Sequence, residues 1–112
     1  MSISIWHKPT CSTSRRALAM VRAAGHDPDI RDYIANPPDA AELARVAALV
    51  GGPATLIRRK EPLFRDMNLK DADDAALLAA MLAHPVLIER PVVLRDGKAV
   101  LGRPAEAIEA LL

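Results

Sequence analysis

The order of hydrophobic patterns in the first 33 residues restricts the possible folds more than any other feature of the chain. Ile3 to Trp6 alternates apolar and polar residues, which is typical of a short strand. From Ser12 the apolar residues follow a helical spacing until Gly25, which suits the end of a helix. Asp29 to Tyr33 is predicted to form a second strand. A strand, a helix and a strand in this order favour a right-handed unit with two parallel strands.

Helical patterns dominate the middle of the chain. Asp39 can cap a helix that a Gly-Gly-Pro sequence then ends. Two more helices are predicted at Pro62 to Leu69 and at Asp73 to Ala83, the latter capped by Asp71 or Asp73. We therefore expect a helical insertion over about residues 37–85.

The last part of the chain returns to strands. Val92-Val93-Leu94 and Ala99-Val100-Leu101 flank an Asp-Gly pair, which is a strong signal for a β-hairpin. Pro104 fits the first position of a closing helix, Ala105 to Leu112. This order of elements predicts an α/β protein with a thioredoxin-like fold, in which a mixed four-stranded sheet (βαβ–ββα) carries the helical insertion between its two halves. Because no linker or repeat interrupts the chain, we expect a single domain over residues 1–112.

Composition limits the compartment and the partners. A chain of 112 residues with 51% hydrophobic residues can bury a core of its own. The formal net charge of +1 gives no reason to expect nucleic acid or an anionic membrane as a partner. The N-terminus lacks the pattern of a signal peptide, and no stretch reaches the roughly 20 apolar residues that span a bilayer. We expect a cytoplasmic protein that acts as a monomer.

The chain has one cysteine, Cys11, between the first predicted strand and the first predicted helix. The unpaired N–H groups and the dipole at a helix start favour a thiolate there, and the same groups can hold an oxyanion beside the sulfur. Ser12, Thr13 and Ser14 add hydroxyl donors for a bound substrate. A lone cysteine is often a buried, inert residue, but the polar loop around Pro9 argues against that interpretation.

The histidines leave two interpretations open. His7 lies four residues before Cys11, where it could act on the thiolate or simply be exposed at the end of a strand. The other histidines, His26 and His84, lie far along the chain, so the three lack the spacing of metal ligands. One cysteine also excludes an internal disulfide and a multi-cysteine zinc site. We therefore expect no metal.

Three arginines occupy conspicuous places in the sequence. Arg90 and Arg103 each precede a proline, at the entrance and the exit of the predicted hairpin, and Arg58 lies in the helical insertion. A tetrahedral oxyanion needs planar, permanently charged donors, which guanidinium provides better than ammonium. Among fifteen Lys and Arg residues, however, spacing alone would leave these three as ordinary surface arginines.

Several motifs together resemble one known family. The segment His7-Lys8-Pro9-Thr10-Cys11-Ser12-Thr13-Ser14-Arg15 is similar to the His-Asn-Pro-x-Cys-x-x-Ser-Arg signature of the glutathione- and glutaredoxin-coupled arsenate reductases. In the family's order follow Asn36-Pro37-Pro38, Leu56-Ile57-Arg58, the stretch from His84 to Pro91, and Gly102-Arg103-Pro104. The resemblance extends from Ile3 to Leu112. Two features depart from the signature: Lys8 replaces the family's Asn, and the chain ends soon after its last helix, as in a shorter branch of the family.

The resemblance implies a role for each of these residues. Cys11 is implied to be the nucleophile, His7 the residue that lowers its pKa, and Ser14 a helper at the thiolate. Arg58, Arg90 and Arg103 are implied to bind the oxyanion, and Pro91 to be a cis-proline before the hairpin. The implied activity is the reduction of arsenate to arsenite, which serves arsenic detoxification, with no bound cofactor.

A single cysteine means that electrons must come from outside the chain. Reduction of As(V) to As(III) consumes two thiol electrons, and Cys11 has no second cysteine beside it. This count agrees with the family's use of glutathione as a cosubstrate and of glutaredoxin as a partner. Our hypothesis is an arsenate thioester on Cys11, its reduction by glutathione, and a mixed disulfide that glutaredoxin resolves.

Other functions would keep the same fold. A glutathione-dependent thiol-disulfide oxidoreductase would need Cys11 but not all three arginines. Relatives of this fold also bind RNA polymerase and regulate transcription. They are similar in having a Cys-x-x-Cys sequence at the helix start, whereas in this chain Ser14 stands at the position of the second cysteine. A phosphatase with a Cys-x5-Arg loop is excluded, because Ala17 lies six residues after Cys11.

Overall fold

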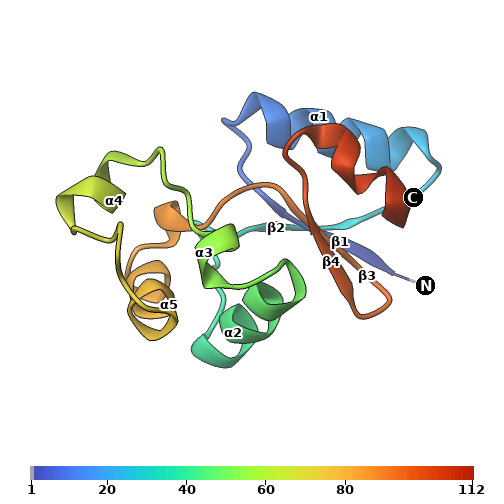
Figure 1. Cartoon of the computed structure of the whole chain (residues 1–112). Helices are drawn as coiled ribbons and strands as arrows, with labels where there is room; N and C mark the ends of the chain where they lie inside the picture. Colours follow the sequence, from blue (N-terminus) through green and yellow to red (C-terminus); the bar gives the residue numbers. More distant parts are fainter. Residues whose placement is uncertain (1) are drawn as a thin grey trace. The chain divides into compact units, whose positions relative to one another are not determined.

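The computed structural model describes residues 2–112 and groups them into two compact units (Figure 1). The first unit combines the chain up to Asn36 with Arg90–Leu112, and the second unit is Pro37–Glu89. The second unit nearly coincides with the helical insertion expected at about 37–85. The expectation that both units form one domain stays a prediction. Among the described residues, no helix has both the length and the apolar character that crossing a bilayer requires.

The first unit is built on a mixed four-stranded sheet with the order β2-β1-β3-β4. β1 runs parallel to β2 and antiparallel to β3, so that Ile5 pairs with Ile30 on one side and with Val93 on the other. The parallel pair at one edge and the hairpin at the other confirm the predicted thioredoxin-like α/β fold. The strands are β1 (Ile3–His7), β2 (Asp29–Asp32), β3 (Val92–Arg95) and β4 (Lys98–Leu101).

The predicted hairpin joins β3 to β4. Asp96 and Gly97 have φ values of 55° and 74°, the left-handed pair that a type I′ turn needs. Because the hairpin returns the chain to the start of β3, the residues that precede β3 and those that follow β4 are neighbours. Gly102 packs closely against Pro91 at this point, since a Cβ on Gly102 would lie 2.8 Å from the Cγ atom of Pro91. The absence of a side chain at Gly102 therefore lets the two ends of the hairpin approach.

Helix α1 (Ser12–Ala23) and the 3-10 helix η2 (Ala105–Leu111) lie on the same side of this sheet and contact each other (Figure 1). Gly25, with a φ of +90°, follows the end of α1 as predicted. The predicted closing helix over Ala105 to Leu112 is confirmed as η2, but Pro104 does not occupy its first position, because its ψ of 165° is extended. The buried core between sheet and helices consists of Ile3, Ile5, Ala17, Leu18, Val21, Val93, Ala105, Ile108 and Leu111.

The second unit consists of helices. Asp39 and Asp73 are confirmed as caps, because their carboxylates accept the N–H groups of Glu42 and Ala76, both at 2.8 Å. Two short elements, α3 and η1, were not predicted. The helices are α2 (Ala40–Leu49), α3 (Pro53–Leu56), α4 (Pro62–Asp66), α5 (Asp74–Ala83) and the 3-10 helix η1 (Pro85–Leu87).

A short bridge within the second unit fixes the position of Arg58. Ile57 and Ile88 form an isolated antiparallel β-bridge. On either side of it, the N–H of Arg58 donates to the carbonyl of Leu87 and the N–H of Glu89 donates to that of Leu56, both at 2.7 Å. The bridge therefore brings Arg58 and Glu89 together although 31 positions separate them.

Candidate active site

Cys11 lies in a tight loop between β1 and α1. Pro9 occupies the second position of a turn that closes with a 2.9 Å hydrogen bond from the Cys11 N–H to the Lys8 carbonyl, and the fixed φ of proline favours that position. Cys11 has an extended backbone, with φ −94° and ψ 121°, and directly precedes α1. Its carbonyl accepts the N–H of Arg15 at 3.0 Å, which begins the helical pattern. The side chain is half-buried, so a ligand can reach the sulfur at the helix start.

The pKa of the Cys11 thiol is lowered even though burial opposes this. Burial alone raises the pKa, but the Ser14 N–H, the guanidinium groups of Arg103 and Arg90, and the Thr13 N–H lower it from 9.0 to about 7. All four groups donate to the sulfur and so stabilise the thiolate. About half of the cysteine is therefore ionised at neutral pH.

This pKa predicts how the reactivity of Cys11 depends on pH. We expect the rate of alkylation by iodoacetamide to rise with pH through a midpoint near 7, because only the thiolate reacts and its fraction falls below that pH. The rate constant, measured from pH 5 to 10 by mass spectrometry, checks this, and the single cysteine makes the signal specific. A midpoint near 9 would show that the donors do not act on the sulfur.

Arg90 and Arg103 lie beside the cysteine because the hairpin brings its two ends together. Arg90 precedes the first residue of the hairpin by two positions, and Arg103 follows β4. The Nη1 atom of Arg103 lies 3.8 Å from Cys11 Sγ and also donates to the carbonyl oxygen of Arg90 at 2.7 Å. Arg90 is buried, with 6% of its surface exposed. The peptide bond between Arg90 and Pro91 is cis, the isomer that the resemblance implied.

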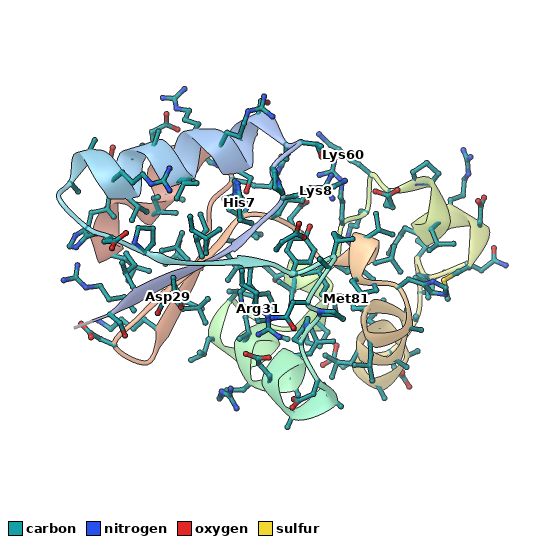
Figure 2. All side chains as sticks on the ribbon, turned by 180° about the vertical axis from the view of Figure 1, so that it is seen from behind. His7, Lys8, Asp29, Arg31, Lys60 and Met81 are labelled. Atoms are coloured by element: carbon teal, nitrogen blue, oxygen red, sulfur yellow. The ribbon has the colours of Figure 1, made fainter. Side chains whose placement is uncertain are left out.

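His7 and Ser14 form a buried polar contact under the loop. His7 Nδ1 and Ser14 Oγ share a hydrogen bond of 2.6 Å, and the Ser14 hydroxyl oxygen also accepts the N–H of Lys8 at 3.1 Å. Figure 2 shows His7 and Lys8 where β1 runs up to the start of α1. His7 is therefore linked to Cys11 through Ser14, because the Ser14 hydroxyl contacts His7 and Lys8 while the Ser14 N–H donates to the sulfur of Cys11.

The charge of His7 follows from its surroundings. Burial lowers the pKa of His7, Asp32 acts in the opposite direction, and Arg22 and Arg15 lower the pKa further. Because the net shift is downward from 6.5, the ring is neutral at neutral pH. The groups that lower the pKa of Cys11 are the N–H and guanidinium donors named above. The role of His7 in activating the cysteine stays a prediction.

The remaining candidate residues lie in different surroundings. Arg58 belongs to the second unit, where its Nη1 lies 2.9 Å from a carboxylate oxygen of Glu89 and its Nε lies 3.7 Å from one of Glu61. Its part in binding an oxyanion stays a prediction. Ser12 is exposed and Thr13 half-buried in the first turn of α1, next to the cysteine. Among the described residues, no three His, Cys, Asp or Glu side chains are grouped as a metal site would require.

Arg15 was not given a role by the sequence analysis, although it belongs to the signature segment. Its Nη1 donates to the Pro9 carbonyl at 2.9 Å, so the helix holds the loop that carries Cys11. The sequence could have indicated a role for Arg15, because it follows Cys11 by four positions and therefore lies on the same face of the helix as the cysteine.

Fold and site together define a class of protein: a thioredoxin-like protein whose single cysteine lies at a helix start beside two arginines. The sequence profile of the ArsC family matches residues 6–111, and the chain belongs to this family.

Similar proteins extend over almost the whole chain. A protein of Neisseria meningitidis serogroup B named arsenate reductase is 40% identical over 98% of this chain and 97% of its own. An arsenate reductase of Rhizobium meliloti is 42% identical and covers 100% of this chain and 82% of its own. The solved structure of an arsenate reductase from Vibrio cholerae is 40% identical, covers 100% of this chain and 98% of its own, and superposes with a TM-score of 0.95.

Proposed function

We propose that this protein reduces arsenate to arsenite through the Cys11 thiolate, with electrons from glutathione and glutaredoxin. The observation that carries the proposal is the Arg103 guanidinium, whose Nη1 lies 3.8 Å from Cys11 Sγ. It is a planar, permanently charged donor for an oxyanion at the nucleophile itself. The names of the relatives from Neisseria meningitidis and Rhizobium meliloti support arsenate as the substrate.

In this proposal the arsenate binds at the start of α1. The N–H groups of the first helical turn and the helix dipole favour an anion there. Arg90 and Arg103 neutralise its oxygens from the hairpin side, and the hydroxyl groups of Ser12 and Thr13 are further donors. Arg58 is the third guanidinium of this proposal. The charge-assisted contacts stabilise the oxyanion as its arsenic is attacked.

The first two steps transfer two electrons to arsenic. The Cys11 thiolate attacks arsenic and one arsenate oxygen leaves as water, which forms an As(V) thioester. The thiolate of glutathione then attacks the Cys11 sulfur, and the electron pair of the sulfur-arsenic bond moves to arsenic. Arsenite leaves, and Cys11 is left in a disulfide with glutathione. In total, one arsenate and two thiols give one arsenite, one disulfide and one water.

The last step regenerates the thiolate. A glutaredoxin thiolate attacks the glutathione sulfur of the mixed disulfide, so the glutathionyl group moves to glutaredoxin and Cys11 leaves as a thiolate. A cysteine with a pKa of about 7 is a good leaving group for this exchange. A reduced thiol pool is required throughout, so in this proposal the reaction takes place in the cytoplasm. We propose further that the protein needs no bound cofactor and acts as a monomer.

The test is NADPH oxidation in an assay coupled through glutathione, glutaredoxin and glutathione reductase. We expect oxidation that depends on arsenate, on glutathione and on glutaredoxin, with phosphate in place of arsenate as the control. No arsenate-dependent oxidation would overturn the proposal. Reduction of a glutathione mixed disulfide without arsenate turnover would identify a thiol-disulfide oxidoreductase instead.

A further inference from the structure

A groove of about 500 Å³ lies in the first unit next to the cysteine loop. We propose that this groove binds glutathione through its carboxylates, an inference that rests on the proposed function because it places the cosubstrate of that reaction. The residues that line the groove are His7, Pro9, Arg15, Leu18, Ala19 and Arg22.

The groove begins at the loop that leads to the nucleophile, because His7 and Pro9 line it. Arg15, Leu18, Ala19 and Arg22 follow Cys11 by four, seven, eight and eleven positions, which is the spacing of one helix face. At about 1.5 Å per residue, Arg15 lies about 6 Å and Arg22 about 16 Å along the axis from the cysteine. The four groove residues of α1 therefore lie along one face of the helix, at increasing distance from Cys11 along its axis.

The two arginines of the groove are placed to meet a ligand near the cysteine. Helical side chains lean toward the N-terminus of their helix, so each guanidinium lies about one turn before its own Cα. The bond from Arg15 Nη1 to the Pro9 carbonyl shows this, because it holds that guanidinium at the level of the loop. By the same rule we expect the guanidinium of Arg22 near the level of Leu18, about 10 Å from the cysteine along the axis.

The charge of the groove favours an anion. Helix α1 contains three arginines and no acidic residue. Arg22 and Arg15 both lower the pKa of His7, so their positive charges act at the wall of the groove. The carboxylate of Asp32 is the group that raises the pKa of His7. Its Oδ1 accepts the N–H groups of Ile34 and Ala35 at 3.1 and 3.2 Å.

Size and shape select a small peptide rather than a protein surface. A volume of about 500 Å³ lies in the usual range of small-molecule sites, about 300–1,000 Å³. An α-linked tripeptide spans at most about 10 Å, and glutathione is longer because its glutamate is joined through the side-chain carboxyl, so it can reach across the rise of about 10 Å between Arg15 and Arg22. Pro9, Leu18 and Ala19 supply apolar contacts for the peptide backbone between the two charged ends. Glutathione has a carboxylate at each end and its thiol on the central residue, so both ends can be held while the sulfur turns toward Cys11.

Replacing Arg22 with alanine tests the proposal. We expect Arg22→Ala to raise the KM for glutathione about tenfold, as for the loss of one charge-assisted hydrogen bond, with the KM for arsenate within about twofold of the wild type. The matched control is Arg16→Ala on the same helix, because Arg16 pairs with Glu106 and does not line the groove. With the diethyl ester of glutathione, whose carboxylates are blocked, wild type and Arg22→Ala should become equal. An equal KM for glutathione in Arg22→Ala and Arg16→Ala would overturn the proposal.

A binding measurement separates this proposal from the proposed function. S-methylglutathione cannot react, so its binding to Cys11→Ser protein can be followed by NMR chemical-shift changes without any turnover. Shifts at Arg15, Leu18, Ala19 and Arg22 that weaken in the additional Arg22→Ala variant support the site, even if arsenate is not reduced. Arsenate turnover with shifts confined to other surfaces would retain the proposed function and reject the groove.

Discussion

Replacing Cys11 with serine should reduce arsenate-dependent NADPH oxidation by at least about 10³-fold, to the background of the coupled assay. A serine hydroxyl stays protonated at neutral pH and is a poor nucleophile for arsenic. It also cannot form a disulfide, so the electrons of glutathione have no route to arsenic through this residue. Both halves of the proposed chemistry therefore fail in one variant, and Cys11 is the only cysteine of the chain.

The Cys11→Ser variant should fold as the wild type does, because its backbone still accepts the N–H of Arg15 and donates to the Lys8 carbonyl. Circular dichroism and thermal unfolding check the fold, and Arg45→Ala, an exposed change in α2, is the control for handling and concentration. If Cys11→Ser retained a tenth or more of the turnover, the reducing thiol would have to come from glutathione alone and Cys11 would not be the nucleophile.

Local signals explain which parts of the fold were predictable. Asp96-Gly97 and the aspartates at positions 39 and 73 act within a few residues of themselves, so turn and cap chemistry identify them without any tertiary contact. Helix α3 and the helix η1 span only four and three residues, too short for a hydrophobic period to appear. The placing of Pro104 failed for a different reason, because proline suits either the first position of a helix or the extended residue before it.

The site was predictable to the extent that topology follows from the order of strands. The hairpin brings Arg90 and Arg103, which flank it, to one end of the sheet, where both act on the pKa of Cys11, but only the resemblance implied that these two arginines belong to the site. The hydrogen bond between His7 and Ser14 was beyond reach, because it depends on how the loop folds over the helix start. The groove along α1 was also missed, since periodicity shows which residues share a helix face but not whether other elements leave that face open.

Replacing Arg103 with alanine should lower kcat/KM for arsenate by about 10²–10³-fold, the usual cost of removing one donor that stabilises developing charge. Two effects combine in this variant. The oxyanion loses a planar, charged donor next to the nucleophile, and the pKa of Cys11 rises because the guanidinium no longer lies 3.8 Å from Sγ. The kinetic constants and the pH profile of Cys11 alkylation measure the two effects separately.

Arg103→Lys distinguishes charge from geometry at the same position. An ammonium group keeps a positive charge near the thiolate, so the pKa of Cys11 should stay closer to 7 than in Arg103→Ala. It cannot donate two parallel hydrogen bonds in one plane to an oxyanion, so kcat/KM for arsenate should remain well below the wild type. If lysine restored both the pKa and the arsenate kinetics, charge alone would be sufficient at this position. If alanine changed neither, Arg103 would have no part in the reaction, and the proximity of its guanidinium to Cys11 would have no catalytic meaning.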